Sequence, residues 1–292
     1  MYLSEIGETF MDKTRLEFEN DLNRGAPFVS EIRKDLSYDI PHYHNELEIV
    51  YVKQGTLKAI CDTECFDASP GEFFIFMPGV VHSFEKSQNN AIYYAKIPPT
   101  TTSEADFSSL RLKSCVIRNN DPLHKTLEPP ILKLFEEREK MLLGYEFAIL
   151  RYSNEIFEKL LRSKTLVPIP KYEQTKIAAR LTLLKTVDSY IAKNYREKIE
   201  LDDAARACGY SKYYFAHYFK MTTQMSFYSY VTAFRLEKAL FALHNSNKSI
   251  TEIAHDFGFG SVRSFDRMFR KYYSTSPVEH LKMHNKNHRR GI

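Results

Sequence analysis

Cysteine is scarce in this sequence, with four residues in a chain of 292. So few thiols over such a length form no dense disulfide framework of the kind that staples small secreted domains. Cys61 and Cys65 are spaced like half of a metal site, but no second pair follows, and buried or incidental thiols explain them better. The sequence therefore predicts free thiols.

Long apolar runs and a signal peptide are also missing. No stretch approaches 18 uninterrupted apolar residues, so we expect no membrane span. The chain begins MYLSEIGETFMDKTRLEFEN, which lacks both a basic start and an apolar core. With 43% hydrophobic and 27% charged residues, the composition is that of an ordinary globular protein, which we expect to be cytoplasmic.

Charge is nearly balanced overall but uneven along the chain. The net charge is +4, yet from Lys176 to the end 20 Lys and Arg residues face 10 Asp and Glu residues. That part carries +10, which leaves −6 for the remainder. A basic module joined to a mildly acidic one is typical of a protein that meets a polyanion, although plain solvation of a charged surface also produces such asymmetry.

Length and hydrophobic periodicity together predict an α+β protein with two domains. Alternating runs such as LEIVYV and EFFIFM, punctuated by Gly and Pro, favour a small β-barrel or sandwich. From residue 121 the spacing becomes helical. We expect a β-barrel over residues 1–120, a helical pair over 121–162 that packs on the barrel or joins two subunits, a linker over 163–174, and an all-helical domain over 175–292.

The C-terminal part contains an internal repeat. LDDAARACGYSKYYFAHYFK aligns with ITEIAHDFGFGSVRSFDRMFRK at an offset of 49, which becomes 50 after the turn. Each copy reads as a short helix, a turn with a glycine and a second helix, the arrangement of a helix-turn-helix. This reading is favoured over a generic helical bundle with a chance repeat.

Individual residues of the repeat fit this arrangement. Ala205 and Ala254 are small, as close contact between crossing helices requires, and Gly209 and Gly258 suit the left-handed end of a first helix. Ser249 with Glu252 has the spacing of a capping box. Two pairs of phenylalanines spaced four residues apart should belong to the core: Phe215 with Phe219, and Phe265 with Phe269.

The repeat resembles the DNA-binding part of the AraC family of transcription regulators, in which two helix-turn-helix units are joined by a long helix. The resemblance covers roughly residues 176 to 284 and includes RLEKA, IAHDFGF and the Ser-Pro pair at 276–277. Gln224 and Ser274 stand where the family usually has glycine, so the ends of both recognition helices should be capped less sharply.

The resemblance implies that the second helix of each unit reads DNA, with side chains at base edges and basic groups on phosphates. Two readers should cover two successive major grooves about 34 Å apart, and a dimer should read a repeated site. Arginine can grip guanine bidentately, and a small apolar side chain can touch a thymine methyl. Carried over by position, the outward residues are Tyr213, Ala216 and His217 in the first recognition helix, and Val262, Arg263, Asp266 and Arg267 in the second. The alternative for each of them is that it is simply a solvated surface residue.

The N-terminal part carries a second set of chemistry-bearing residues. His42, His44 and Glu48 resemble the first signature of the cupin barrel, and His82 stands at the histidine of the second. In metal-binding cupins these positions hold the ligands, and three imidazoles with a carboxylate suit a divalent transition metal. A straight strand would put His44 and Glu48 roughly 13 Å apart, so they can share a site only if the chain turns at residues 45–46.

Three roles remain open for this quartet: metal ligands, polar walls of an effector pocket, or hydrogen bonding at the barrel rim. Regulators of this architecture commonly bind an organic effector, often a sugar. We therefore interpret the chain as a transcription activator that binds double-stranded DNA as a homodimer under control of a carbohydrate, with RNA polymerase as a further candidate partner. The alternative is a metal-dependent cupin enzyme or metal sensor fused to a DNA-binding domain, although no separate acid, base or substrate clamp stands out.

Overall fold

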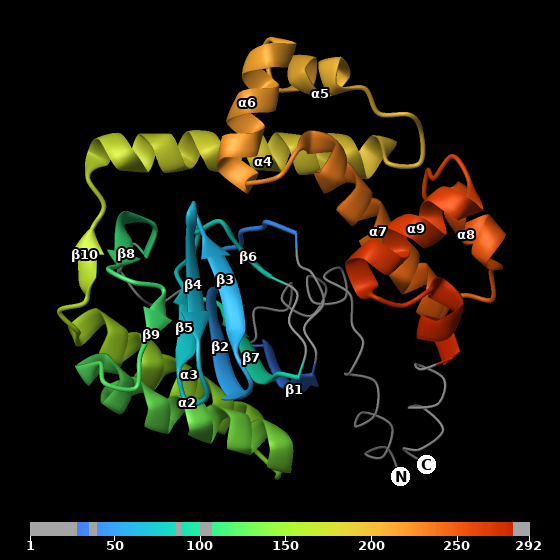
Figure 1. Ribbon diagram of the computed structural model, residues 1–292. Coiled ribbons are helices and arrows are strands. Elements are labelled where there is room, and N and C mark those ends of the chain that lie inside the picture. Colours follow the sequence, from blue (N-terminus) through green and yellow to red (C-terminus); the bar gives the residue numbers. More distant parts are fainter. Residues whose placement is uncertain (1–27, 35–39, 86–88, 100–106, 283–292) are drawn as a thin grey trace. The chain divides into compact units, whose positions relative to one another are not determined.

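The computed structural model describes residues 28–34, 40–85, 89–99 and 107–282 (Figure 1). It divides into two compact units between residues 179 and 180, here called the N-terminal and the C-terminal unit. The N-terminal unit combines ten strands with helices, and helices form the C-terminal unit in the described part of the chain, which confirms the expected α+β class. Within the described ranges, no helix has the length and apolar character needed to cross a membrane.

Three antiparallel sheets make up the strand-rich part of the N-terminal unit. The largest has five strands, which in spatial order are β1 (Phe28–Lys34), β7 (Ala91–Ile97), β2 (Leu47–Gln54), β5 (Phe73–Phe76) and β9 (Val116–Ile117). The second has three: β4 (Glu64–Ala68), β3 (Leu57–Cys61) and β6 (His82–Phe84). A short 3-10 helix, η2 (Phe107–Ser109), leads into the third sheet, which pairs β8 (Leu110–Leu112) with β10 (Leu166–Pro168).

The expected β-barrel is not closed. In the described part of the chain, no ladder of strands connects the five-stranded sheet to the three-stranded one. The segment before β2 is joined to β6 by an isolated β-bridge between His42 and His82. Strands of three to five residues, such as β5 and β6, carry too few ladder hydrogen bonds to run around a tilted barrel. The unit is therefore an open two-sheet structure.

Strand β2 is central because both of its faces are covered. Its first six residues are all buried. Leu47, Ile49 and Tyr51 share a core cluster with residues of α2 (Pro122–Lys140) and α3 (Tyr145–Arg162), and Figure 1 shows both helices lying along this sheet. By strand alternation the other face presents Glu48 and its neighbours to the interior. The expected helical pair thus packs on the β-structure.

The segment 163–174, expected to be an irregular linker, is largely regular structure. Residues 166–168 form β10, which pairs with β8, and α4 (Lys171–Asn194) begins three residues later. Pro168 is tolerated because β10 lies at the edge of its sheet, and Pro170 precedes the first helical residue, where its fixed φ suits a helix start. The division between the two units therefore falls inside a helix.

The C-terminal unit contains the two expected helix-turn-helix motifs. The first consists of α5 (Leu201–Ala207) and α6 (Lys212–Thr223), and the second of α8 (Ile250–Asp256) and α9 (Val262–Tyr273), with α7 (Phe227–Asn245) between them (Figure 1). All four phenylalanines of the repeat are completely buried, as are Ala205 and Ala254. The capping box of Ser249 and Glu252 is present. These sequence predictions are confirmed.

Both recognition helices end in left-handed residues that are not glycine. Gln224 has φ 57° and Ser274 has φ 64°, and their backbone N–H groups donate to Lys220 O and Arg270 O. The caps therefore form without the glycines that are usual in the family. A left-handed residue with a Cβ costs roughly 1 kcal/mol relative to glycine, and the buried phenylalanines behind each helix offset this cost.

Gly258 and its repeat partner Gly209 provide a matched test of the two turns. Both have left-handed φ, but a Cβ on Gly258 would lie 2.4 Å from Tyr195 O, whereas a Cβ on Gly209 would meet nothing within 4 Å. Tyr195 O also accepts a hydrogen bond from Arg235 Nε at 2.7 Å, so it cannot move away freely. We expect Gly209→Ala to cost about 1 kcal/mol and Gly258→Ala about 1–3 kcal/mol more, measured by thermal unfolding. Equal losses would contradict this packing.

Candidate effector site and DNA-reading surface

The four residues of the N-terminal quartet converge. One ligand atom from each of His42, His44, Glu48 and His82 lies within 4.8 Å of those of the others. The chain bends at residues 45–46, which is the turn that the sequence required. On the other side, His42 and His82 exchange both backbone N–H···O bonds at 2.9 Å, which fixes β6 against the segment before β2. All four side chains are buried or nearly so and do not lie on an exposed rim.

Backbone carbonyls orient each imidazole. His42 Nδ1 lies 2.9 Å from Ile40 O, His44 Nδ1 lies 3.0 Å from Glu46 O, and His82 Nδ1 lies 2.9 Å from Val80 O. Because a carbonyl oxygen only accepts, each Nδ1 must donate its hydrogen. A neutral ring then carries its lone pair on Nε2, on the side of the quartet. This is the arrangement that commonly fixes histidine ligands around a metal.

Glu48 stands at the centre of the quartet and is fully buried. Its Oε2 accepts a hydrogen bond from Tyr94 Oη at 2.8 Å and lies 3.6 Å from Lys96 Nζ. Burial alone would raise the pKa of Glu48, but His82, Lys96 and the hydrogen bond with His44 hold that pKa well below its ordinary value. The second oxygen, Oε1, is buried and has no hydrogen-bond partner among the described residues.

His44 has more acceptors than it can satisfy. Burial and the charge of Lys96 lower the pKa of His44 to about 4, so the ring is neutral near pH 7 and carries one N–H. Its Nδ1 faces Glu46 O, and its Nε2 lies 2.8 Å from Glu48 Oε2. One hydrogen cannot serve both contacts. A cation shared by Nε2 and the carboxylate would satisfy both, so the donor set fits a divalent transition metal held by imidazole and carboxylate.

Lys96 and Tyr94 are functional candidates that the sequence reading left out of the quartet. Both lie on β7, and the β2–β7 register pairs Glu48 with Lys96. The sequence signal that could have identified Lys96 is that it is the single charged residue in the run AIYYAKI. In the structure all seven positions of this run are buried. A buried charge needs a partner, and Glu48 provides it.

The DNA-reading candidates lie on the outward sides of α6 and α9. Tyr213 is 87% exposed and His217 is exposed, whereas Ala216, Val262 and Asp266 are half-buried. Arg263 and Arg267 are exposed, one helical turn apart, and make no ion pair within the described chain. Asp266 instead accepts from Arg270 Nε at 2.9 Å. The two arginines therefore remain available for base edges.

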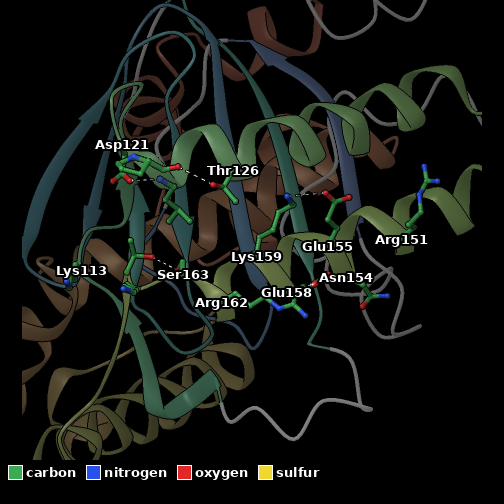
Figure 2. Close-up of a pocket in the computed structure, with 14 residues that line it drawn as sticks. Lys113, Asp121, Thr126, Arg151, Asn154, Glu155, Glu158, Lys159, Arg162 and Ser163 are labelled. Carbon is green, nitrogen blue, oxygen red and sulfur yellow. Dashed lines mark hydrogen bonds and ion pairs between the residues drawn. The ribbon is translucent and has the colours of Figure 1, made fainter.

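A groove of about 1100 Å³ lies elsewhere in the N-terminal unit, along α3 and the start of α2. Figure 2 shows charged side chains such as Arg151, Lys159 and Arg162 on its walls beside uncharged ones such as Thr126 and Asn154, and none of the quartet lines it. Lys159 pairs with Glu155 at 3.5 Å, and Arg162 pairs with Glu158. Such i,i+4 pairs on an open helix surface are ordinary solvated contacts. The quartet therefore remains the candidate effector site.

These features define a class of protein: a buried polar site in a β-rich unit, followed by a helical unit with two helix-turn-helix motifs. The sequence profile of the AraC-like ligand binding domain matches residues 28–137, and that of a helix-turn-helix domain matches residues 204–283. The chain belongs to the AraC family of transcription regulators. It is thus a DNA-binding regulator with a ligand-binding domain.

Similar proteins include the uncharacterized HTH-type transcriptional regulator YdeC of Bacillus subtilis, 22% identical over 89% of this chain and 92% of that protein. The transposon Tn10 TetD protein of Escherichia coli is 38% identical over 33% of this chain and 70% of its own length. Among solved structures, fatty acid-bound ToxT from Vibrio cholerae has a TM-score of 0.52 at 12% identity and covers 88% of this chain and 95% of its own. The last likeness concerns the fold alone.

Proposed function

We propose that this chain is a sequence-specific transcription regulator whose DNA binding is controlled by a divalent transition metal at His42, His44, Glu48 and His82. The supporting observation is a pair of unsatisfied buried atoms in the described structure, Glu48 Oε1 and His82 Nε2. Buried polar atoms nearly always have a partner. His82 Nε2 lies 3.4 Å from Glu48 Oε2, within the same cluster. A metal cation bound between these two atoms would satisfy both of them.

Our second proposal for the same site is an organic effector, for which the resemblance to the AraC family suggests a carbohydrate. Its support is the polar surroundings of Glu48. Lys96 Nζ carries three hydrogens that suit hydroxyl or anionic oxygens, and Tyr94 Oη, which donates its hydrogen to Glu48 Oε2, can accept one from a hydroxyl group. The positive charge of Lys96 also repels a metal cation at this site, which favours an organic effector. Catalysis is not part of either proposal, because a sensor requires binding alone.

The metal proposal is tested by titrating metal-stripped full-length protein with Zn²⁺, Mn²⁺, Co²⁺ and Ni²⁺ in a thermal-shift assay. At a hundredfold excess over the dissociation constant, binding should stabilise the protein by about 2.7 kcal/mol. Affinity for DNA selected by the protein from a random library should change in the same titration. Stabilisation by sugars alone would favour the organic effector, and metal binding without any change in DNA affinity would contradict metal control.

We propose a homodimer formed through the exposed apolar side chains at the start of α3. Phe147 is 78% exposed, and Leu142, Leu143 and Leu150 are exposed beside it in sequence. Contiguous exposed apolar residues mark interaction surfaces. Sedimentation velocity should give the mass of a dimer, and a monomer at micromolar concentration would contradict the proposal.

An activator role, with contact to RNA polymerase, is proposed on the basis of membership in the AraC family. A reporter gene placed behind the selected site should lose expression when the regulator gene is deleted. A gain of expression would instead indicate repression.

A further inference from the structure

A small pocket lies in the C-terminal unit, where the segment after α4, the last turns of α7 and the C-cap of α8 meet. It has a volume of about 310 Å³, and none of the described residues that line it is acidic. The recognition helices α6 and α9 contribute none of these lining residues. The pocket combines an aromatic floor of Tyr195, Phe241 and Phe257 with a cationic rim of Arg196, Lys238 and Lys248.

The aromatic floor is held in place by backbone hydrogen bonds. The rings of Tyr195 and Phe257 stack with centroids 6.0 Å apart and an interplanar angle of 24°. Tyr195 O accepts from Arg235 Nε at 2.7 Å, and Phe257 N donates to Ile253 O at 3.1 Å. Tyr195, Phe241 and Phe257 are all half-buried. The floor is therefore preformed, and an apolar side chain can pack on it without the cost of ordering the pocket first.

The cationic rim is accessible to a charged partner. Arg196 and Lys248 are exposed, and Lys238 is half-buried. Lys248 pairs with Asp256 at 2.5 Å, whereas Arg196 Nε donates to the neutral Tyr195 hydroxyl at 3.2 Å. Because the lining itself carries only positive charge among the described residues, it attracts an anionic occupant.

The combination of floor and rim selects among the possible anions. Sites for free small molecules usually cover most of the ligand surface, whereas two of the three cations here are exposed. DNA phosphates would pair with the cations but leave the aromatic floor uncovered. An acidic peptide with one bulky apolar side chain would use both parts of the pocket, since its side chain can fill the floor while its carboxylates reach the rim.

We propose that this pocket docks an acidic peptide segment of a partner protein. One aromatic side chain of the segment packs on the aromatic floor, and the carboxylates on either side of it pair with the cationic rim. Arg196 suits this role because a planar guanidinium can bind a carboxylate bidentately. Since the recognition helices are not part of the lining, docking and DNA binding should occur together. The proposal depends neither on a metal at the quartet nor on an activator role.

The test adds full-length protein to a fluorescein-labelled peptide in which one phenylalanine stands between two runs of aspartate and glutamate, and follows fluorescence anisotropy. We expect saturable binding. Replacing the phenylalanine of the peptide by alanine, or its acidic residues by their amides, should weaken binding roughly tenfold or more, because each change removes one of the two kinds of contact. Binding should be largely unchanged when the protein is first saturated with its selected DNA site.

Arg196→Glu should lower the affinity for the same peptide roughly tenfold or more, because it places a like charge against the peptide carboxylates. Lys193→Glu is the matched control, since Lys193 is exposed on α4 and undergoes the same change of charge outside the lining. Its effect should be small, because salt screens charges that are not in contact. Thermal unfolding verifies that both variants fold.

Three results would overturn the proposal. The first is that the wild-type protein does not bind the peptide, and the second is that the two variants lose affinity equally. The third is displacement of the peptide by the selected DNA site, which would assign the cationic rim to DNA phosphates.

Discussion

Replacing Glu48 by Gln should lower the affinity of the protein for divalent transition metals by roughly 100-fold or more. Loss of a partner that only supports a metal ligand typically costs 10–100-fold, and Glu48 would be a ligand itself. The amide keeps the shape of the side chain but removes the one carboxylate that would accompany three imidazole ligands. Competition against a chromophoric chelator measures the constant, and an unchanged constant would remove Glu48 from the site.

Lys96→Met provides a companion variant with an effect in the opposite direction. The Lys96 ammonium lies 3.6 Å from Glu48 Oε2 and repels any cation placed there. Removing it should tighten metal binding but weaken binding of a hydroxylated or anionic organic effector. The sign of the change therefore separates the two proposals for the site.

The single Glu48→Gln variant also leaves Lys96 buried without its carboxylate, which destabilises a protein by about 3–5 kcal/mol in comparable cases. The double variant Glu48→Gln with Lys96→Met removes both charges together. It should recover thermal stability without recovering metal binding. Recovery of metal binding in the double variant would show that Glu48 acts only through Lys96.

Replacing Arg263 and Arg267 together by alanine should abolish most of the preference of the protein for its specific DNA site. A bidentate arginine–guanine contact contributes about 1–3 kcal/mol of discrimination, so two contacts correspond to roughly 30-fold to more than 1,000-fold in affinity. Binding to random DNA should fall far less, because it depends mainly on phosphate contacts.

Arg270→Ala is the matched control on the same helix. Arg270 is exposed like the other two, but its guanidinium is paired with Asp266 and Glu279. Its removal should change the ratio of specific to random affinity little. The measurement is fluorescence anisotropy at one fixed salt concentration on a site selected by the wild-type protein. If the double variant kept the wild-type ratio, α9 would not be a base-reading helix.

The helical unit could be predicted closely because its signals are local. Gly209 and Gly258 adopt left-handed φ, and the Ser249–Glu252 box forms as its spacing indicated. The bend at residues 45–46 was likewise a local requirement of the quartet. Each of these features depends on residues a few positions apart, where steric and hydrogen-bonding rules act directly.

Features that depend on distant pairing were missed. Lys96 reaches Glu48 only through the register of β2 on β7, and nothing in the local pattern of either strand specifies that register. The open sheet edges depend in the same way on the short lengths of β5 and β6. Residues 163–174 were read as a linker because two prolines interrupt the periodicity, whereas pairing of β10 with β8 decides their structure.

The length of helix α7 determines both the distance and the relative rotation of the two helix-turn-helix motifs that it connects. Each of its 19 residues contributes about 1.5 Å of rise and about 100° of rotation. Inserting one residue into α7 would therefore change the separation of the two readers by less than half a base-pair step, but would turn one reader about a quarter of the way round relative to the other. Rotational phase is the more sensitive quantity. The spacing between the two half-sites in DNA should accordingly be constrained more by their rotational phase than by the distance between them.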